Sequence, residues 1–245
     1  MTNLAGAHMR AEIYEQPEIL QRLIDHAGAV LQPVAQTASG CAFAMLAARG
    51  SSDNASTYGR YLLEGLAGLP TALAAPSLYT LYNTPPRLNN ALIIGVSQSG
   101  AAADVIAVLN EGRKQRAVTL AITNTAGSPM TLAASHVLLL NAGLEKALAA
   151  TKTVTGQCTA YALLAANLAP ASSLKGDLQQ LPAPIDRVLK IEDSLARAAQ
   201  SWEGIERVVV IGRGYTYGAS EEIALKLKET CFIAAEAYSA ADFLH

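Results

Sequence analysis

Ala91 to Gly100 reads ALIIGVSQSG, and this stretch decides the fold class. Its first six residues are apolar or glycine without alternation, a pattern typical of a β-strand that is buried on both faces. The polar turn Ser97-Gln98-Ser99-Gly100 follows, and a helix is expected over residues 101–113. Strands buried on both faces belong to parallel sheets, because helical crossovers cover both sides of such a sheet.

Four more short apolar runs are expected to pair with this strand. They span residues 41–48, 69–75, 118–123 and 137–140. The helices expected between and after them cover residues 55–67, a short segment from Ser128-Pro129, and residues 148–168. Strands that alternate with helices predict a doubly wound, five-stranded parallel sheet in a flavodoxin-like three-layer α/β fold. An amphipathic helix pair over residues 10–31 leads into it.

The start of this pattern recurs after a Pro-, Ser- and Gln-rich segment and a helix expected over residues 185–201. Val208 to Thr216 repeats the order of residues 43–52, which is apolar strand, Arg-Gly and small polar turn. Such a repeat predicts a second, similar domain. The expected division is N-terminal helices 1–34, a first domain 35–170, a linker 171–184 and a partial second domain 185–245.

Composition narrows the class of partner. The formal net charge is -2 and charged residues make up 16% of the chain, so no basic surface favours nucleic acid or an anionic membrane. Apolar stretches are interrupted before the roughly 20 residues that a membrane span needs. The three cysteines, Cys41, Cys158 and Cys231, have neither paired nor metal-binding spacing, and we expect reduced core residues in a cytoplasmic protein.

Ligands of open parallel sheets bind beyond the carboxyl ends of the strands. Three polar segments follow expected strands there, namely Ser51-Ser52, Ser97-Gln98-Ser99-Gly100 and residues 143–152. Serine hydroxyls and helix N-termini can surround a phosphate dianion, so these segments predict a small phosphate ester as ligand. The alternative is that the serines are ordinary helix caps. Nucleotide loops are disfavoured, because neither the Walker nor the dinucleotide glycine spacing occurs.

A series of motifs in order along the chain resembles the SIS-domain phosphosugar isomerase family. The resemblance is to the isomerase half of glucosamine-6-phosphate synthase and to stand-alone glucosamine-6-phosphate deaminases. The motifs are EIYEQP at 12–17, RGSS at 49–52, SQSG at 97–100, NAG-x-E at 141–145, ATK at 150–152, ALKLKE at 224–229 and AEAY at 235–238.

The resemblance implies a role for each matching residue. Ser52, Ser97, Gln98 and Ser99 would bind the phosphate, and Gly50, Ser51, Leu148, Ala149, Ala150 and Thr151 would lie at the sugar. Glu229 matches the base that moves a proton between carbons 1 and 2, His245 the ring-opening residue, and Lys226 a lysine beside the base. It also implies a homodimer with shared active sites and the absence of metal and organic cofactor.

The sequence departs from the family's pattern at two places. Ala101 and Ala102 stand where the synthases have Glu and Thr, so one hydroxyl contact to phosphate is lost. The chain stops at His245, and we expect the second domain to be partial and the glutaminase domain and the C-terminal Schiff-base lysine to be absent. Glutamine-driven synthesis is therefore not expected.

Two functions remain open from the sequence. One is an isomerase/deaminase that acts on glucosamine 6-phosphate and fructose 6-phosphate, or on another amino-sugar phosphate such as galactosamine 6-phosphate. The other is a non-catalytic sugar-phosphate-binding regulatory module. Residues taken alone allow Glu229 to be a solvated helix carboxylate among Lys226 and Lys228, and His245 to be a frayed terminus.

Overall fold

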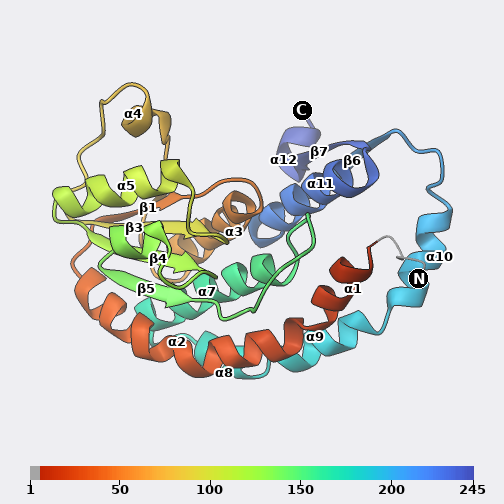
Figure 1. Cartoon of the computed structure of the whole chain (residues 1–245), viewed down its shortest axis with the longest axis horizontal. Coiled ribbons are helices and arrows are strands. Elements are labelled where there is room, and N and C mark those ends of the chain that lie inside the picture. The colour runs from red at the N-terminus through yellow and green to blue at the C-terminus, as the bar shows by residue number, and fades with distance from the viewer. Residues whose placement is uncertain (1–5) are drawn as a thin grey trace.

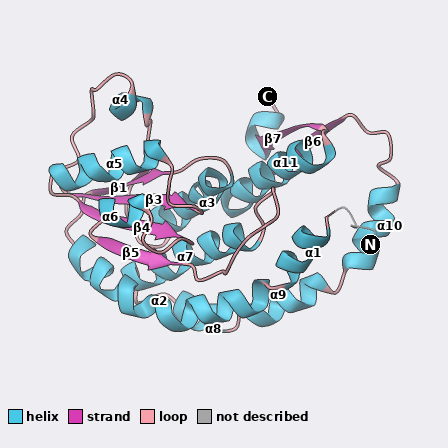
Figure 2. Ribbon diagram, in the orientation of Figure 1, coloured by secondary structure: helices cyan, strands magenta, loops and turns pink. Residues whose placement is uncertain are grey.

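The structure, a computed structural model, describes residues 6–245, so the first five residues of the expected N-terminal segment lie outside it. A five-stranded sheet with every pairing parallel forms its centre, as predicted. The strand order is β2-β1-β3-β4-β5 (Figure 2). The strands are β1 (Phe43–Ala47), β2 (Thr71–Leu73), β3 (Ala91–Ser97), β4 (Val118–Thr123) and β5 (His136–Leu139).

Helices cover both faces of this sheet, which gives the predicted three layers (Figure 1). One face packs against α2 (Gln16–Ala38), α3 (Ser51–Gly65) and α7 (Lys152–Leu168). The other packs against α4 (Ser77–Thr80), α5 (Ala103–Lys114) and α6 (Pro129–Ala133). The strand β3 is buried along its whole length, because its alternate side chains enter the two cores.

Three helices begin elsewhere than the sequence predicts. Gly50 has a φ of 56°, which lets the chain turn directly from β1 into α3 at Ser51 rather than near residue 55. Helix α5 begins at Ala103, two residues later than expected. Helix α7 begins at Lys152 instead of residue 148, so Leu148 to Thr151 is loop with its backbone outside the helix.

A second unit repeats the first strand-helix-strand order, as the sequence predicts. It contains β6 (Arg207–Gly212), the short 3-10 turn η1 (Gly214–Thr216), α11 (Tyr217–Cys231), β7 (Ala234–Ser239) and α12 (Ala240–Phe243). Strands β6 and β7 pair in parallel, like β1 and β2. Helix α11 packs on α3, where Gly218 approaches so closely that a Cβ would lie 2.5 Å from the Asn54 carbonyl oxygen.

The segment between the two units, which includes the predicted linker over residues 171–184, contains short helices. Helix α8 (Leu174–Gln179) buries Leu178, and α9 (Pro182–Leu189) packs along α2. The single helix expected over residues 185–201 is interrupted after α9 and continues as α10 (Glu192–Gln200). At the N-terminus, α1 (Ala7–Tyr14) and α2 form the predicted pair, although α2 extends to Ala38.

Two further expectations can be compared with the structure. Cys41 and Cys158 are partly buried, but Cys231 is exposed at the end of α11, so the prediction of a core cysteine is wrong there. Among residues 6–245, no helix combines the length and the apolar composition of a membrane span.

Helices α3 and α7 pack so closely at Gly59 that a larger residue at this position should destabilise the protein. A Cβ on Gly59 would lie 2.4 Å from the ring of the buried Tyr161, whose hydroxyl is 2.9 Å from Ser56 Oγ. Overpacking of this kind costs about 1–3 kcal/mol. We therefore expect Gly59→Ala to lower the free energy of unfolding by about that amount, measured by urea denaturation.

Gly28 provides the matched control. It lies inside α2, and a Cβ there would meet no atom within 4 Å. Gly28→Ala should therefore raise the free energy of unfolding by roughly 0.5–1 kcal/mol through helix propensity. If both variants shift stability in the same direction, the close packing of Gly59 on Tyr161 is not what distinguishes them.

Candidate functional site

The strand order places a topological switch point between β1 and β3. From β1 the chain goes to β2 on one side, and it then crosses to β3 and continues outward to β5 on the other side. A crevice opens beyond the carboxyl ends of the strands where the order reverses, and ligands of such sheets bind there. The two segments that border this crevice are Arg49–Ser52 and Ser97–Gly100, which are the predicted sugar- and phosphate-binding segments.

Both helices that begin at this crevice lack a side-chain cap from their N-cap residue. Gly50 is the N-cap of α3 and Ala102 is the N-cap of α5. The loop serines do not fill this role, because Ser97 Oγ accepts the Gly100 N–H at 3.2 Å and Ser99 Oγ accepts the Ala101 N–H at 3.3 Å. The interpretation of the serines as helix caps is therefore wrong, and the first N–H groups of α5 have no capping side chain.

Gly100 fixes the shape of the loop after β3. Its φ is 64°, and a Cβ there would lie 2.1 Å from Ser128 Oγ and 2.9 Å from Thr123 Oγ1. The Ser128 hydroxyl is buried without a hydrogen-bond partner among the described residues. The Gly100 carbonyl also accepts the Met130 N–H at 3.0 Å, so the loop is packed against the start of α6. Only glycine fits both the conformation and the space at this position.

Asn124 joins the loop after β3 to the loop after β5. Its backbone N–H donates to the Gln98 carbonyl at 3.1 Å. Its side-chain amide donates to the Gly143 carbonyl at 2.7 Å, and its Oδ1 accepts the Ala142 N–H at 2.8 Å. The sequence reasoning missed this residue, and the one signal for it is a polar side chain directly after the strand at residues 118–123.

The predicted sugar-binding residues 148–151 lie in the loop before α7. Glu145 Oε1 accepts the N–H groups of Thr151 at 2.9 Å and Thr153 at 3.2 Å, so this carboxylate caps α7 from within the loop. That capping explains why the helix begins at Lys152. Leu148 is 96% exposed, whereas Ala149 is buried. The loop thus presents backbone as well as side chains at the carboxyl edge of the sheet.

Helix α11 brings two of the predicted catalytic residues to the loop after β1. The Lys226 ammonium donates to Ser51 Oγ at 2.9 Å and to Glu229 Oε2 at 2.7 Å. It also lies 3.1 Å from Glu222 Oε1. Lys226 is therefore the link between the carboxylates of α11 and the first domain. As the solvated-carboxylate interpretation allows, Glu229 is an exposed residue of α11 that is paired with Lys226, and its side chain is 35% exposed.

His245 lies apart from these groups. It is exposed after α12, and its backbone N–H donates to the Asp242 carbonyl at 3.4 Å. Within residues 6–245 no hydrogen bond or ion pair connects it with Glu229 or Lys226. A single copy of the chain therefore does not join the three predicted catalytic residues.

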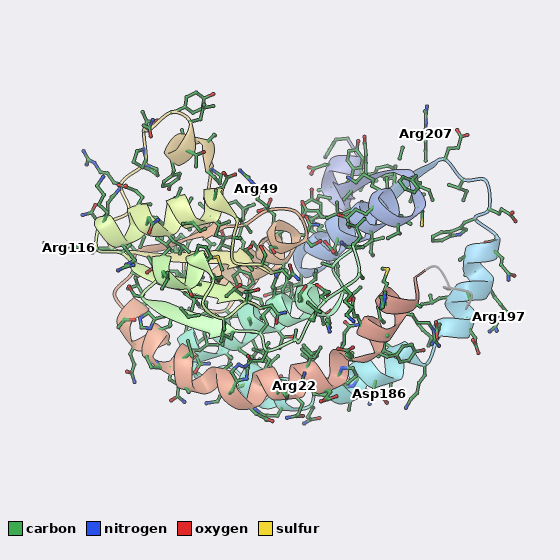
Figure 3. All side chains as sticks on the ribbon, viewed as in Figure 1. Arg22, Arg49, Arg116, Asp186, Arg197 and Arg207 are labelled. Carbon is green, nitrogen blue, oxygen red and sulfur yellow. The ribbon has the colours of Figure 1, made fainter. Side chains whose placement is uncertain are left out.

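Charged side chains surround the loop after β1. Arg49 Nε donates to Asp104 Oδ2 at 2.9 Å, which holds the guanidinium at the first turn of α5, and Figure 3 labels Arg49 between the sheet and the second unit. Burial raises the pKa of Asp53, and Arg49 partly offsets this. Burial also raises the pKa of Glu221, which Thr57 lowers and Asp53 raises further. Burial thus disfavours the charged forms of these two carboxyl groups.

Two hollows border α11. One of about 280 Å³ has Gly50, Asp53, Glu221 and Lys228 in its wall, so it adjoins the predicted site. The other, of about 440 Å³, lies between α3, α7, α9 and α11 and is mainly apolar. No residue assigned to the site by sequence lines the apolar cavity. Of the two, the smaller hollow has a residue predicted for the site, Gly50, in its wall.

A family model and several known proteins are similar to this chain. The family model described as the SIS domain matches residues 43–167. A glutamine–fructose-6-phosphate aminotransferase [isomerizing] of Symbiobacterium thermophilum is 38% identical over 97% of this chain. The match covers 42% of that protein, so this chain spans about two fifths of the length of that relative.

Two solved structures are similar over nearly the whole chain. One, from Silicibacter pomeroyi and provisionally named a phosphosugar isomerase, has 38% identity and a TM-score of 0.91 over 97% of this chain and 73% of its own. The other is the C-terminal domain of glucosamine-fructose-6-phosphate aminotransferase from Francisella tularensis. It has 25% identity and a TM-score of 0.83, and the match covers 100% of this chain and 73% of that domain.

Proposed function

This chain belongs to the SIS-domain family of phosphosugar isomerases, and from that premise we propose that it is an isomerase/deaminase of an amino-sugar 6-phosphate. The observation that carries the proposal is the contact of Lys226 with both Ser51 and Glu229. It supports the proposal because it holds the Glu229 carboxylate near the first residue of α3, where we propose that the anion binds.

The phosphate site that we propose lies between the N-termini of α3 and α5. Ser52, Ser97, Gln98 and Ser99 contribute hydroxyl, amide and backbone groups, and each hydrogen bond to a charged oxygen adds about 1.5–3 kcal/mol. Helix N-termini attract anions through their free N–H groups and partial positive charge. Arg49 supports the site as the nearby cation, where Ala101 and Ala102 provide no hydroxyl.

The proposed chemistry is proton transfer between neighbouring carbons. Glu229 removes the proton from carbon 2 of the open-chain amino sugar and returns it to carbon 1 through an enediol-type intermediate. Lys226 stabilises the carboxylate of Glu229 and keeps it next to the loop after β1. The resulting imine takes up one water and releases one ammonia, so glucosamine 6-phosphate gives fructose 6-phosphate. Galactosamine 6-phosphate would react in the same way at the same atoms.

Phosphate recognition is tested by Ser97→Ala and Ser99→Ala. Each removed hydroxyl takes away a donor to a charged oxygen, so each variant should weaken fructose 6-phosphate binding by about 10- to 100-fold. Isothermal titration calorimetry measures this. Ser77→Ala, at an exposed serine of α4, is the control and should leave the affinity unchanged. Equal affinities in all four proteins would refute the assigned phosphate site.

The role of Glu229 is tested by NMR, which follows the exchange of the carbon-2 hydrogen of glucosamine 6-phosphate with deuterated solvent. The wild-type chain should exchange it, and Glu229→Gln should lower the rate at least about 100-fold while still binding the sugar phosphate. Glu203→Gln, at an exposed glutamate before β6, should exchange at the wild-type rate. Wild-type binding without any exchange would instead favour the regulatory, non-catalytic function.

We further propose a homodimer in which His245 reaches the site of the partner subunit. The two-stranded β6–β7 sheet has open edges, and several apolar side chains around it are exposed. They are Val209, Ile211, Phe243 and Leu244. Light scattering should give twice the 25.6 kDa of one chain. A monomer that persists as the protein concentration rises would contradict the shared site.

A further inference from the structure

The motif at Glu12 to Pro17 has no role in the proposed chemistry, yet it lies against the predicted sugar-binding loop. Glu12 is on α1 and only 4% exposed. Its carboxylate accepts the Lys146 N–H in a short hydrogen bond and the Ala147 N–H at 3.2 Å. A carboxylate from the start of the chain therefore binds backbone donors more than 130 residues away.

A second carboxylate of the same motif acts on the loop through Lys152. The Lys152 side chain is almost fully buried, and its ammonium donates to Glu15 Oε2 at 2.6 Å and to the Leu144 carbonyl at 2.9 Å. Gln16 Oε1 also accepts the Thr155 hydroxyl at 2.5 Å. The junction of α1 and α2 thus contacts the first turn of α7 and, through Lys152, is linked to the Leu144 carbonyl at the beginning of the loop.

The loop has little else to define its shape. Among the described residues, no backbone-to-backbone hydrogen bond outside helices and strands involves residues 143–150. Its N–H groups at Lys146 and Ala147 are bound by Glu12 instead, and Leu148 is solvent-exposed. A buried carboxylate is costly unless hydrogen bonds compensate it. Glu12 is compensated by these loop amides, so the two features stabilise each other.

The loop is also connected with the proposed phosphate site. Asn124 binds Ala142 and Gly143 at the end of β5 and the Gln98 carbonyl after β3. The phosphate loop therefore fixes one end of residues 143–151, while α1 fixes the middle. Under the proposed function, one anchor would be next to the phosphate of a sugar phosphate and the other next to its sugar.

We infer that Glu12 and Glu15 are positioning residues, which hold the backbone of residues 144–151 in the conformation that receives the sugar portion of the substrate. This inference rests on the proposed function and names what fixes its sugar-binding loop. Helix α1 is itself held from outside, because Arg10 binds the Glu192 carboxylate with two 2.7 Å contacts and Tyr14 donates to it at 2.5 Å. Figure 1 shows α1 between α10 and the beginning of α7.

The test compares two ligands in Glu12→Gln. Inorganic phosphate reports on the phosphate loop alone, and fructose 6-phosphate reports on phosphate and sugar together. A glutamine amide has one acceptor oxygen and adds a donor opposite the loop N–H groups. We expect the affinity for phosphate to stay within about twofold, and the advantage of fructose 6-phosphate over phosphate to fall at least about 10-fold. Hydrogen exchange of residues 144–151 should become faster.

Glu18→Gln is the matched control, because Glu18 is on α2 in an exposed pair with Arg22 and the same charge is lost. It should change neither ligand's affinity nor the exchange of the loop. Equal weakening of both ligands by Glu12→Gln, or a lower melting temperature with an unchanged affinity ratio, would show a merely structural role and overturn the inference.

Two further measurements keep the outcome decisive. If Glu12→Gln does not fold, Glu15→Gln replaces it, since Glu15 is half-exposed and acts through Lys152. The same loss of sugar affinity is expected, and its absence overturns the inference. If the wild-type chain binds neither ligand, the proposed function fails by itself. Hydrogen exchange then decides the positioning role, and unchanged exchange of residues 144–151 in the variants refutes it.

Discussion

The reversal of strand order between β1 and β3 is the constraint on which the site depends. The helices after these two strands pass to opposite faces of the sheet, α3 to one and α5 to the other. Their N-termini consequently flank one crevice, and neither has a capping side chain of its own. Two sets of free N–H groups converge where no lysine is needed to attract an anion. The loops after β4 and β5, and helix α11, are arranged around this crevice.

Local sequence is sufficient for the sheet, because an unbroken apolar run such as residues 91–96 fits only a strand covered on both faces. It is insufficient for the helix starts. The start of α7 depends on Glu145, which caps the helix from the preceding loop. The break between α9 and α10 was missed as well, because both segments carry helix-forming residues and the interruption at Lys190 and Ile191 has no glycine or proline.

The candidate site also has some features that the sequence predicts and others that depend on tertiary contacts. The polar turn after residues 91–96 predicts the loop after β3, whereas Lys226 and Glu229 are predicted only through the resemblance to the SIS-domain family. The contact of Lys226 with Ser51 could not be predicted in this way, because it requires α11 to dock on α3 across 175 residues of sequence. Asn124 and Glu12 were missed for a similar reason. Their polar groups bind backbone amides, and a backbone amide has no signature in the sequence.

Electrostatics explain why the anion site must be built from dipoles and paired cations. Burial raises the pKa of Asp53 and of Glu221 beside the loop after β1, so the charged forms of these two groups are disfavoured. Lys226 lies between Glu222 and Glu229, and Arg49 is paired with Asp104. A phosphate dianion in this crevice therefore competes with carboxylates for both cations. Binding through helix N-termini, as proposed, would avoid that competition and would leave Lys226 paired with Glu229.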